Sequence, residues 1–219
     1  MTNPSIQRIR DFTPEEFYQY VKDQIDRVDI ESNDKYRLAF DLDRHVDKAH
    51  ESEREFRKTY TPKEWFKRKF KPTIDTTLNN IEKTMDGQPI YREIVVCNPK
   101  DQLEVDLTRP LLKEPIGSSW SYYDDTLAIE WGKCPDTQTN KPILIKAQLL
   151  NPEGIDVDAS LIVNMNWDVA SASENEIRLK KGAKVHVTEI CEKRWVGSRR
   201  VPLKDVVKHC HPTDQIFHN

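Results

Sequence analysis

The sequence lacks any apolar run long enough to cross a bilayer. A membrane-spanning helix needs about 20 consecutive apolar residues, and no segment of this 219-residue chain approaches that length. Residues 1–10 also lack the apolar stretch of a secretory signal peptide. We therefore expect a protein that does not bind membranes and that stays in the cytoplasm where it is made.

An excess of charge of one sign is also missing. The chain has 34 basic and 37 acidic residues spread along its length, for a formal net charge of -3. No global field would attract it to nucleic acid or to an anionic membrane, so any contact with nucleic acid would have to be local. With 32% charged and 37% hydrophobic residues, the composition predicts a folded, highly charged protein.

Cysteine is sparse, and the spacing of the cysteines is uninformative for metal binding. No two of them form a Cys-x-x-Cys pair, which argues against a zinc site and against a redox motif. We predict reduced thiols at all four positions: Cys97, Cys134, Cys191 and Cys210. The triplet His209-Cys210-His211 has metal-binding residue types, but strand neighbours point to opposite faces and no second cluster completes a tetrahedron. We expect no metal.

Residues 1–86 have helical patterns. Thr13-Pro14-Glu15-Glu16 and Thr61-Pro62-Lys63-Glu64 each place Thr at a helix cap, Pro in the first turn and Glu where it can bond back to the cap. Apolar residues recur at helical spacing in a charged segment at about 34–58. Two further apolar stripes are Phe17, Val21, Ile25 and Val28 after the first cap, and Ile74, Leu78, Ile81 and Met85 before Asp86-Gly87, which should end a helix.

Residues 87–219 have a different sequence pattern. Short β-rich segments are separated by Pro, Gly, Asn and Asp, and they predict strands at 90–97, 142–150, 176–179 and 184–191. One helix is expected at about 124–131. The chain is thus predicted to be an α+β protein, with a helical N-terminal region at 1–86 and a β-rich domain at 87–219.

Three motifs in the β-rich part carry the functional signal. In order along the chain they are Ile90-Tyr91-Arg92 at a strand start, Ser119-Trp120-Ser121, and Glu174-Asn175-Glu176 entering a strand. In this order the sequence resembles the Arg-Ser-Glu class of ADP-ribosyltransferases, which is related to clostridial and cholera-type toxins. The resemblance covers about residues 89–192. It implies a split-sheet ADP-ribosyltransferase-like domain at 87–219 that uses NAD⁺ as substrate and needs no metal.

The resemblance also implies a role for each carboxylate. Cleavage of the nicotinamide–ribose bond builds positive charge on the sugar, as in glycoside hydrolysis, so a carboxylate beside the ribose lowers the barrier. The resemblance assigns this role to Glu176. Because residues i and i+2 of a strand share a face, Glu174 is expected in the same cleft, where it would orient the acceptor or take its proton.

The remaining motif residues would bind the nucleotide. The guanidinium of Arg92 suits the NAD⁺ diphosphate or its ribose. Ser119 would bond the nicotinamide ribose or hold Glu176 in place. Tyr91 and Ser121, which belong to the same two motifs, complete the expected NAD⁺-binding set. Without the resemblance, each of these residues has an ordinary interpretation as a surface or turn residue.

The predicted function is mono-ADP-ribosyl transfer to a macromolecule with release of nicotinamide. Glu174 favours a protein arginine as acceptor, and residues 167–173 would form the loop that meets it, although an RNA or DNA base is an alternative. The same residues also fit NAD⁺ glycohydrolase activity, or a non-catalytic binding module, which is favoured by Glu93 where the family often has Gly. The family also suggests a toxin or phage-conflict effector with a neutralising partner protein.

Overall fold

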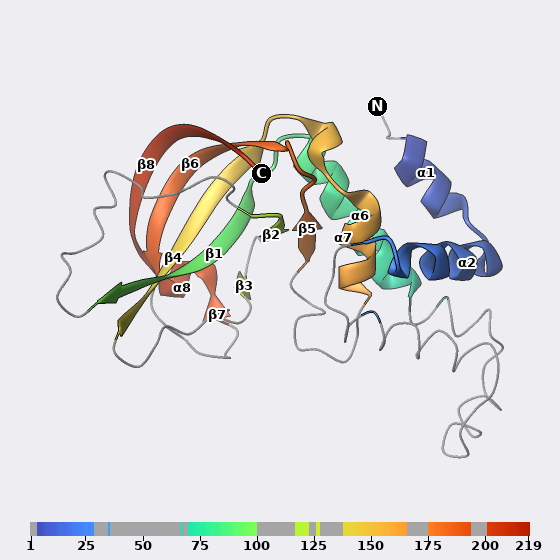
Figure 1. Cartoon of the computed structure of the whole chain (residues 1–219), viewed down its shortest axis with the longest axis horizontal. Helices are drawn as coiled ribbons and strands as arrows, with labels where there is room; N and C mark the ends of the chain where they lie inside the picture. The colour runs from blue at the N-terminus through green and yellow to red at the C-terminus, as the bar shows by residue number, and fades with distance from the viewer. Residues whose placement is uncertain are drawn as a thin grey trace, which may run out of the picture. The chain divides into compact units, whose positions relative to one another are not determined.

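A computed structural model describes residues 4–28, 70–99, 117–122, 126–127, 138–165, 175–193 and 201–219, together with the single positions 35 and 67 (Figure 1). The chain divides into two compact units: the first takes its residues from 1–82 and 157–172, and the second from 83–156 and 173–219. The helices expected at 34–58 and after Thr61 fall outside the described residues. Within the described parts, none of the helices has the length and apolarity that crossing a bilayer requires.

The described part of the first unit is helical. Its elements are α1 (Pro4–Asp11), α2 (Pro14–Ile25), most of α6 (Lys71–Met85) and α7 (Val157–Asn164). The apolar stripes predicted for α2 and α6 are confirmed, since Phe17, Val21, Leu78 and Ile81 are buried. Gly87 has a φ of 88° and follows α6, in agreement with the predicted helix end.

The start of α2 is a complete capping box. The hydroxyl of Thr13 accepts a hydrogen bond from the Glu16 amide at 3.2 Å, and the Glu16 carboxylate accepts one from the Thr13 amide at 2.8 Å. These bonds to the charged form lower the pKa of Glu16, and the backbone amide of Thr13 makes the largest contribution. The motif predicted from sequence is therefore present in full.

Removing the cap should weaken the first unit. We expect Thr13→Ala to lower the free energy of unfolding by about 1 kcal/mol, because an amide of the first turn loses its hydrogen-bond acceptor. Urea unfolding followed by far-UV circular dichroism measures the change. Thr13→Ser, which keeps the hydroxyl, is the matched control, and an equal loss in both variants would contradict the role of the cap.

Helix α7 was not predicted, because it has no polar face. Its buried residues occur on all sides of the helix and include Ala159, Leu161 and Ile162 as well as the polar Ser160 and Asn164. A helix that is buried all round shows no amphipathic period in its sequence. In the same unit, Tyr20 of α2 donates a hydrogen bond to Asp158 of α7.

The second unit is built on a six-stranded antiparallel sheet with the strand order β5-β2-β1-β4-β6-β8. Figure 1 shows β1, β4, β6 and β8 as long neighbouring strands, while β2 and β5 are short. The strands are β1 (Ile90–Pro99), β2 (Ser119–Ser121), β4 (Gln138–Leu149), β5 (Glu176–Arg178), β6 (Lys184–Lys193) and β8 (Val207–His218). The α+β class and the four predicted strands are confirmed, with shifts of a few residues at their ends.

The helix expected at 124–131 is wrong at its described residues. Thr126–Leu127 form the short strand β3, which pairs with β7 (Val201–Pro202). Pairing with β7 supplies hydrogen-bond partners for the backbone amides and carbonyls of these residues, although their apolar spacing had suggested a helix. Two further short elements were not predicted: the 3₁₀ turn η2 (Pro152–Gly154) and helix α8 (Leu203–Val206).

The prediction of reduced thiols is wrong for two of the cysteines. Cys191 of β6 and Cys210 of β8 are direct partners across the two strands and form a disulfide. Strand β8 was not predicted, so no local pattern placed these two residues opposite each other. The other two cysteines offer no test, since the structure does not describe their side chains.

Candidate functional site

The described motif residues Tyr91 and Arg92, Ser119–Ser121, and Glu176 lie on three adjacent strands, β1, β2 and β5, respectively. The register pairs Tyr91 with Ser121 and Ser121 with Glu176, so these residues form a row across the sheet. At the other end of the β2–β5 pairing, Ser119 is opposite Arg178. Residues that are distant in sequence therefore meet through strand pairing alone.

The central contact of the site joins Ser119 and Glu176. The Ser119 hydroxyl donates a hydrogen bond of 2.6 Å to Oε1 of Glu176, across 57 residues of sequence. The Glu176 side chain is only 20% exposed. A hydrogen-bonded and largely buried carboxylate keeps one orientation better than a solvated carboxylate does. Of the two contacts expected for Ser119, the structure contains the one to Glu176.

Arg178 is a member of this cluster that sequence reasoning missed. Its Nε lies 3.1 Å from Oε1 of Glu176, and its side chain is likewise 20% exposed. Its Nη1 donates a hydrogen bond of 3.3 Å to the Ser118 hydroxyl. The signal was available, because residues i and i+2 of a strand share a face. The guanidinium and the Ser119 hydroxyl thus act on the same carboxylate oxygen.

Arg92 contacts the backbone of β2. Its Nη1 donates a hydrogen bond to the carbonyl of Ser119. The guanidinium also covers Gly117, where a Cβ would collide with its nitrogens. Gly117 has a φ of 88°, so a side chain would be excluded on both backbone and steric grounds. Burial lowers the pKa of Arg92, Glu176 partly counteracts the shift, and Arg178 adds to it.

Tyr91 and Arg92 cannot line the same face of β1. Neighbouring strand residues point to opposite faces, and β1 pairs with β4 without a bulge. Directly paired strand residues share a face, so the row puts Tyr91 on the face of Glu176, and the Arg92 side chain starts from the opposite face of β1. Tyr91 also packs against a buried cluster of Leu144, Cys191 and Val206. Ser121 is partly buried between Tyr91 and Glu176 in the row across the sheet.

Glu174 lies outside the described residues, as does the loop expected at 167–173. The structure does, however, overturn the argument that placed Glu174 on the face of Glu176. Strand β5 begins at Glu176, and Asn175 has a φ of 49°, in the left-handed region. The Asn175 carbonyl accepts a hydrogen bond from the Tyr122 amide at 3.0 Å. Strand alternation cannot be extended through such a residue.

Aromatic residues beside the motifs divide into core and surface. Trp120 is 1% exposed and belongs to the core, and its indole N–H donates a hydrogen bond to the Gly117 carbonyl at 2.9 Å. Tyr122 is partly exposed, and Nζ of Lys83 lies 5.0 Å from the centroid of its ring.

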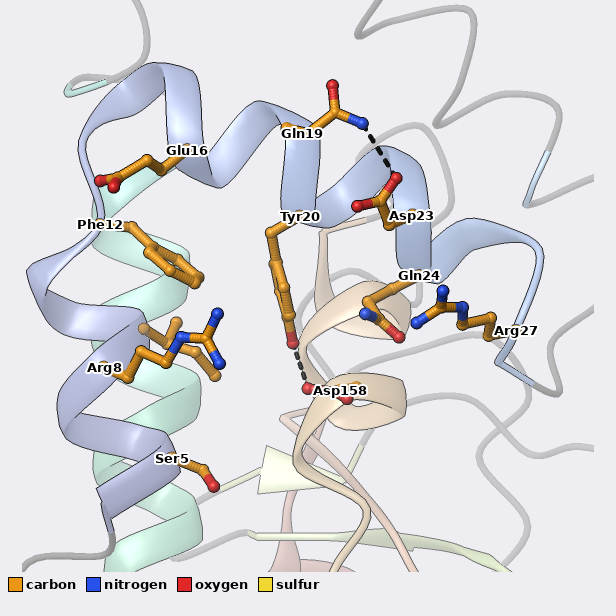
Figure 2. Close-up of a pocket in the computed structure, with 11 residues that line it drawn as sticks. Ser5, Arg8, Phe12, Glu16, Gln19, Tyr20, Asp23, Gln24, Arg27 and Asp158 are labelled. Carbon is orange, nitrogen blue, oxygen red and sulfur yellow. Dashed lines mark hydrogen bonds between the residues drawn. The ribbon is translucent and has the colours of Figure 1, made fainter.

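The first unit contains a polar pocket of about 580 Å³ that includes none of the predicted site residues (Figure 2). Arg8 of α1 and Arg27, which follows the end of α2, extend into it from different sides, and the hydrogen-bonded pair of Tyr20 and Asp158 lies between them. Its lining mixes cations, carboxylates and aromatic rings. This mixture selects no single class of ligand.

Comparisons with known proteins found no match, so a functional argument rests on the residues of this chain and their geometry. No family model matches the chain, and neither a curated protein nor a solved structure does.

Proposed function

We propose that the chain transfers ADP-ribose from NAD⁺ to a macromolecular acceptor and releases nicotinamide. The observation that carries this proposal is the hydrogen bond from the Ser119 hydroxyl to the Glu176 carboxylate. The two residues come from separate sequence motifs that the resemblance to ADP-ribosyltransferases selected. The paired strands β2 and β5 bring them into contact, and this contact supports a shared role.

The arrangement suits the charge changes of the reaction. As the bond to nicotinamide breaks, positive charge grows on the ribose, and a fixed carboxylate beside it stabilises that charge. Ser119 and Arg178 fix Glu176 from two directions, so little reorganisation is needed when the charge appears. Glu176 is the catalytic residue in this proposal, and Arg178 is a positioning residue.

Arg92 suits the anionic part of NAD⁺. Within the part of the chain that the structure describes, the only side-chain hydrogen bond of Arg92 comes from Nη1, and Nε is buried without a hydrogen-bond partner. A guanidinium with unused donors fits a diphosphate, which accepts several hydrogen bonds in a fixed geometry. Gly117 leaves room for the guanidinium on this side of β2.

Incubation with NAD⁺ labelled in its adenylate part and with a whole-cell lysate tests the proposal. Transfer predicts label in macromolecules together with one released nicotinamide per ADP-ribose attached. Label that protease removes identifies a protein acceptor, and label that nuclease removes identifies RNA or DNA. Free ADP-ribose alone would mean glycohydrolase activity. No release of nicotinamide under any condition would overturn the proposal and favour a binding module.

Arg178 offers a test of how Glu176 is held. We expect Arg178→Gln to lower the rate of nicotinamide release about tenfold, less than loss of the carboxylate itself, because Ser119 still orients Glu176. Arg178→Lys should recover part of the rate, since it keeps the positive charge. The split between kcat and the Kd for NAD⁺ separates positioning from damage to the fold: a positioning role lowers kcat and leaves the Kd nearly unchanged. Equal losses of turnover and NAD⁺ binding, with no recovery in Arg178→Lys, would contradict the assignment.

Glu174 allows the acceptor step to be separated from cleavage. If this carboxylate prepares the acceptor, Glu174→Gln should lose most transfer but keep measurable hydrolysis of NAD⁺, since water attacks without such help. Parallel assays of labelled acceptor and free ADP-ribose measure the two rates. Equal losses in both would place Glu174 in the NAD⁺ site, and no loss in either would favour a non-arginine acceptor.

A further inference from the structure

The disulfide between β6 and β8 lies beside a carboxylate. One carboxylate oxygen of Glu189 and the sulfurs of Cys191 and Cys210 are three donor atoms that all lie within 4.8 Å of one another. These residues lie outside the three sequence motifs of the proposed NAD⁺ site, and nothing in that function uses them. Reduction of the disulfide would free both sulfurs to act as metal ligands.

Strand geometry holds the three groups together whether or not the sulfurs are bonded. Cys191 and Cys210 are directly paired across the strands, and Glu189 precedes Cys191 by two residues on the same strand face. Backbone pairing continues on both sides of the disulfide, at Ile190 with His211 and at Lys193 with Val207. Reduction would therefore leave two thiols and a carboxylate facing one another on a formed sheet.

We propose that the reduced chain binds a thiophilic divalent cation, of which Zn²⁺ is the physiological example, through Cys191, Cys210 and Glu189. Zn²⁺ takes thiolate sulfur at about 2.3 Å and carboxylate oxygen at about 2.0–2.2 Å, so its ligands lie at most about 4.6 Å apart. The separation of the donors here meets this limit with small side-chain adjustments. Three protein ligands leave a fourth tetrahedral position for water.

The surroundings of the three ligands favour access for a cation. Cys191 is buried but Cys210 is exposed, so an ion can enter from solvent on the side of β8. Glu189 pairs with Nζ of Lys146 at 3.4 Å, with both side chains about one third exposed. Such an exposed ion pair contributes little stability. Thiolates and a carboxylate are a donor set that selects Zn²⁺ or Cd²⁺ over Mg²⁺ or Ca²⁺.

Disulfide formation and cation binding use the same two sulfurs and exclude each other. A phosphine reductant gives two electrons to the disulfide and becomes the phosphine oxide; water supplies the oxide's oxygen and the protons of the two thiols. Binding of Zn²⁺ then releases those two protons, because only thiolates are ligands. The site therefore exists only under reducing conditions.

Zinc titration of the full chain tests the proposal. The chain is reduced with a phosphine, desalted without oxygen, and titrated with Zn²⁺ against a chromophoric chelator; Co²⁺ gives thiolate-to-metal absorption bands as an independent readout. We expect one ion bound per chain in the reduced state and at least about a tenfold loss of affinity in Cys210→Ser. Cys97 and Cys134 are the same in both proteins, so the difference reports on this pair.

The carboxylate has a matched control on the same strand. Glu189→Gln should also weaken binding about tenfold or more, whereas Glu192→Gln, on the opposite face of β6, should leave the affinity unchanged. Comparison of the reduced and oxidised native chain requires no substitution, and binding should vanish on oxidation. Absence of zinc binding by the reduced chain, or equal binding by reduced Cys210→Ser, would overturn the proposal.

Discussion

Glu176→Gln should lower ADP-ribosyl transfer and nicotinamide release by a factor of about 10²–10³ while leaving the Kd for NAD⁺ within about threefold. The carboxylate stabilises charge that appears only as the glycosidic bond breaks, so its loss affects turnover and not ground-state binding. The amide keeps the size of the side chain and can still accept the hydrogen bond from Ser119. Steady-state rates and calorimetric titration with NAD⁺ measure the two effects.

Two comparisons make this result specific. Glu153→Gln neutralises an exposed carboxylate of the same unit and should change neither quantity. Ser119→Ala should give an intermediate loss, because Arg178 continues to hold Glu176. Turnover of Glu176→Gln within about threefold of the native rate would remove Glu176 from the catalytic role.

Helix caps, apolar stripes and turns were predicted correctly from short stretches of the sequence. The Thr13 capping box, the stripe that contains Leu78 and the turn at Gly87 were predicted, and all three are present. Each depends on residues within about one or two helical turns of one another. The same holds for the four predicted strands, whose apolar residues alternate or run together between turn residues.

Features that depend on long-range pairing were not predicted. Strand β8 is an edge strand whose residues are mostly exposed, and it includes Pro212, so its sequence resembles a loop. With β8 missing from the prediction, the disulfide of Cys210 with Cys191 could not be anticipated. Helix α7 was missed for the opposite reason, since burial on all sides hides its period.

The sequence selected residues that the structure brings together, but it did not predict their geometry. The motif order selected Ser119 and Glu176, and their hydrogen bond is consistent with that choice. Arg178 was overlooked, although strand alternation places it beside Glu176. Asn175 shows the limit of that rule: its left-handed backbone immediately precedes the strand, so the alternation that the prediction applied to Glu174 does not reach that residue.

Glu93 has a structural explanation that the sequence could not supply. It follows Arg92 where the resemblance leads one to expect Gly, and it was therefore the main argument for a non-catalytic module. In the structure its carboxylate accepts a hydrogen bond from Nζ of Lys193, across 100 residues of sequence. The side chains are 0% and 9% exposed for Lys193 and Glu93, respectively. This buried pair connects β1 with β6, which gives Glu93 a structural role in the sheet.

Breaking this pair should be the most destabilising single change considered for the chain. We expect Lys193→Met to lower the free energy of unfolding by about 3–5 kcal/mol, because the Glu93 carboxylate would remain buried without its cation. Methionine preserves most of the apolar stem of lysine, so lost packing is a minor part of the effect. Urea unfolding at neutral pH, followed by tryptophan fluorescence, measures the loss.

The double variant Glu93→Leu/Lys193→Met separates the buried charge from other causes. Replacing both partners removes the need to desolvate a charge, so most of the stability should return. A loss of less than about 1 kcal/mol in Lys193→Met would mean that water reaches the pair in solution. If the double variant folds and still cleaves NAD⁺ at a rate close to that of the native chain, Glu93 serves the sheet alone. If it folds but has lost cleavage, Glu93 also acts on the site beside Arg92.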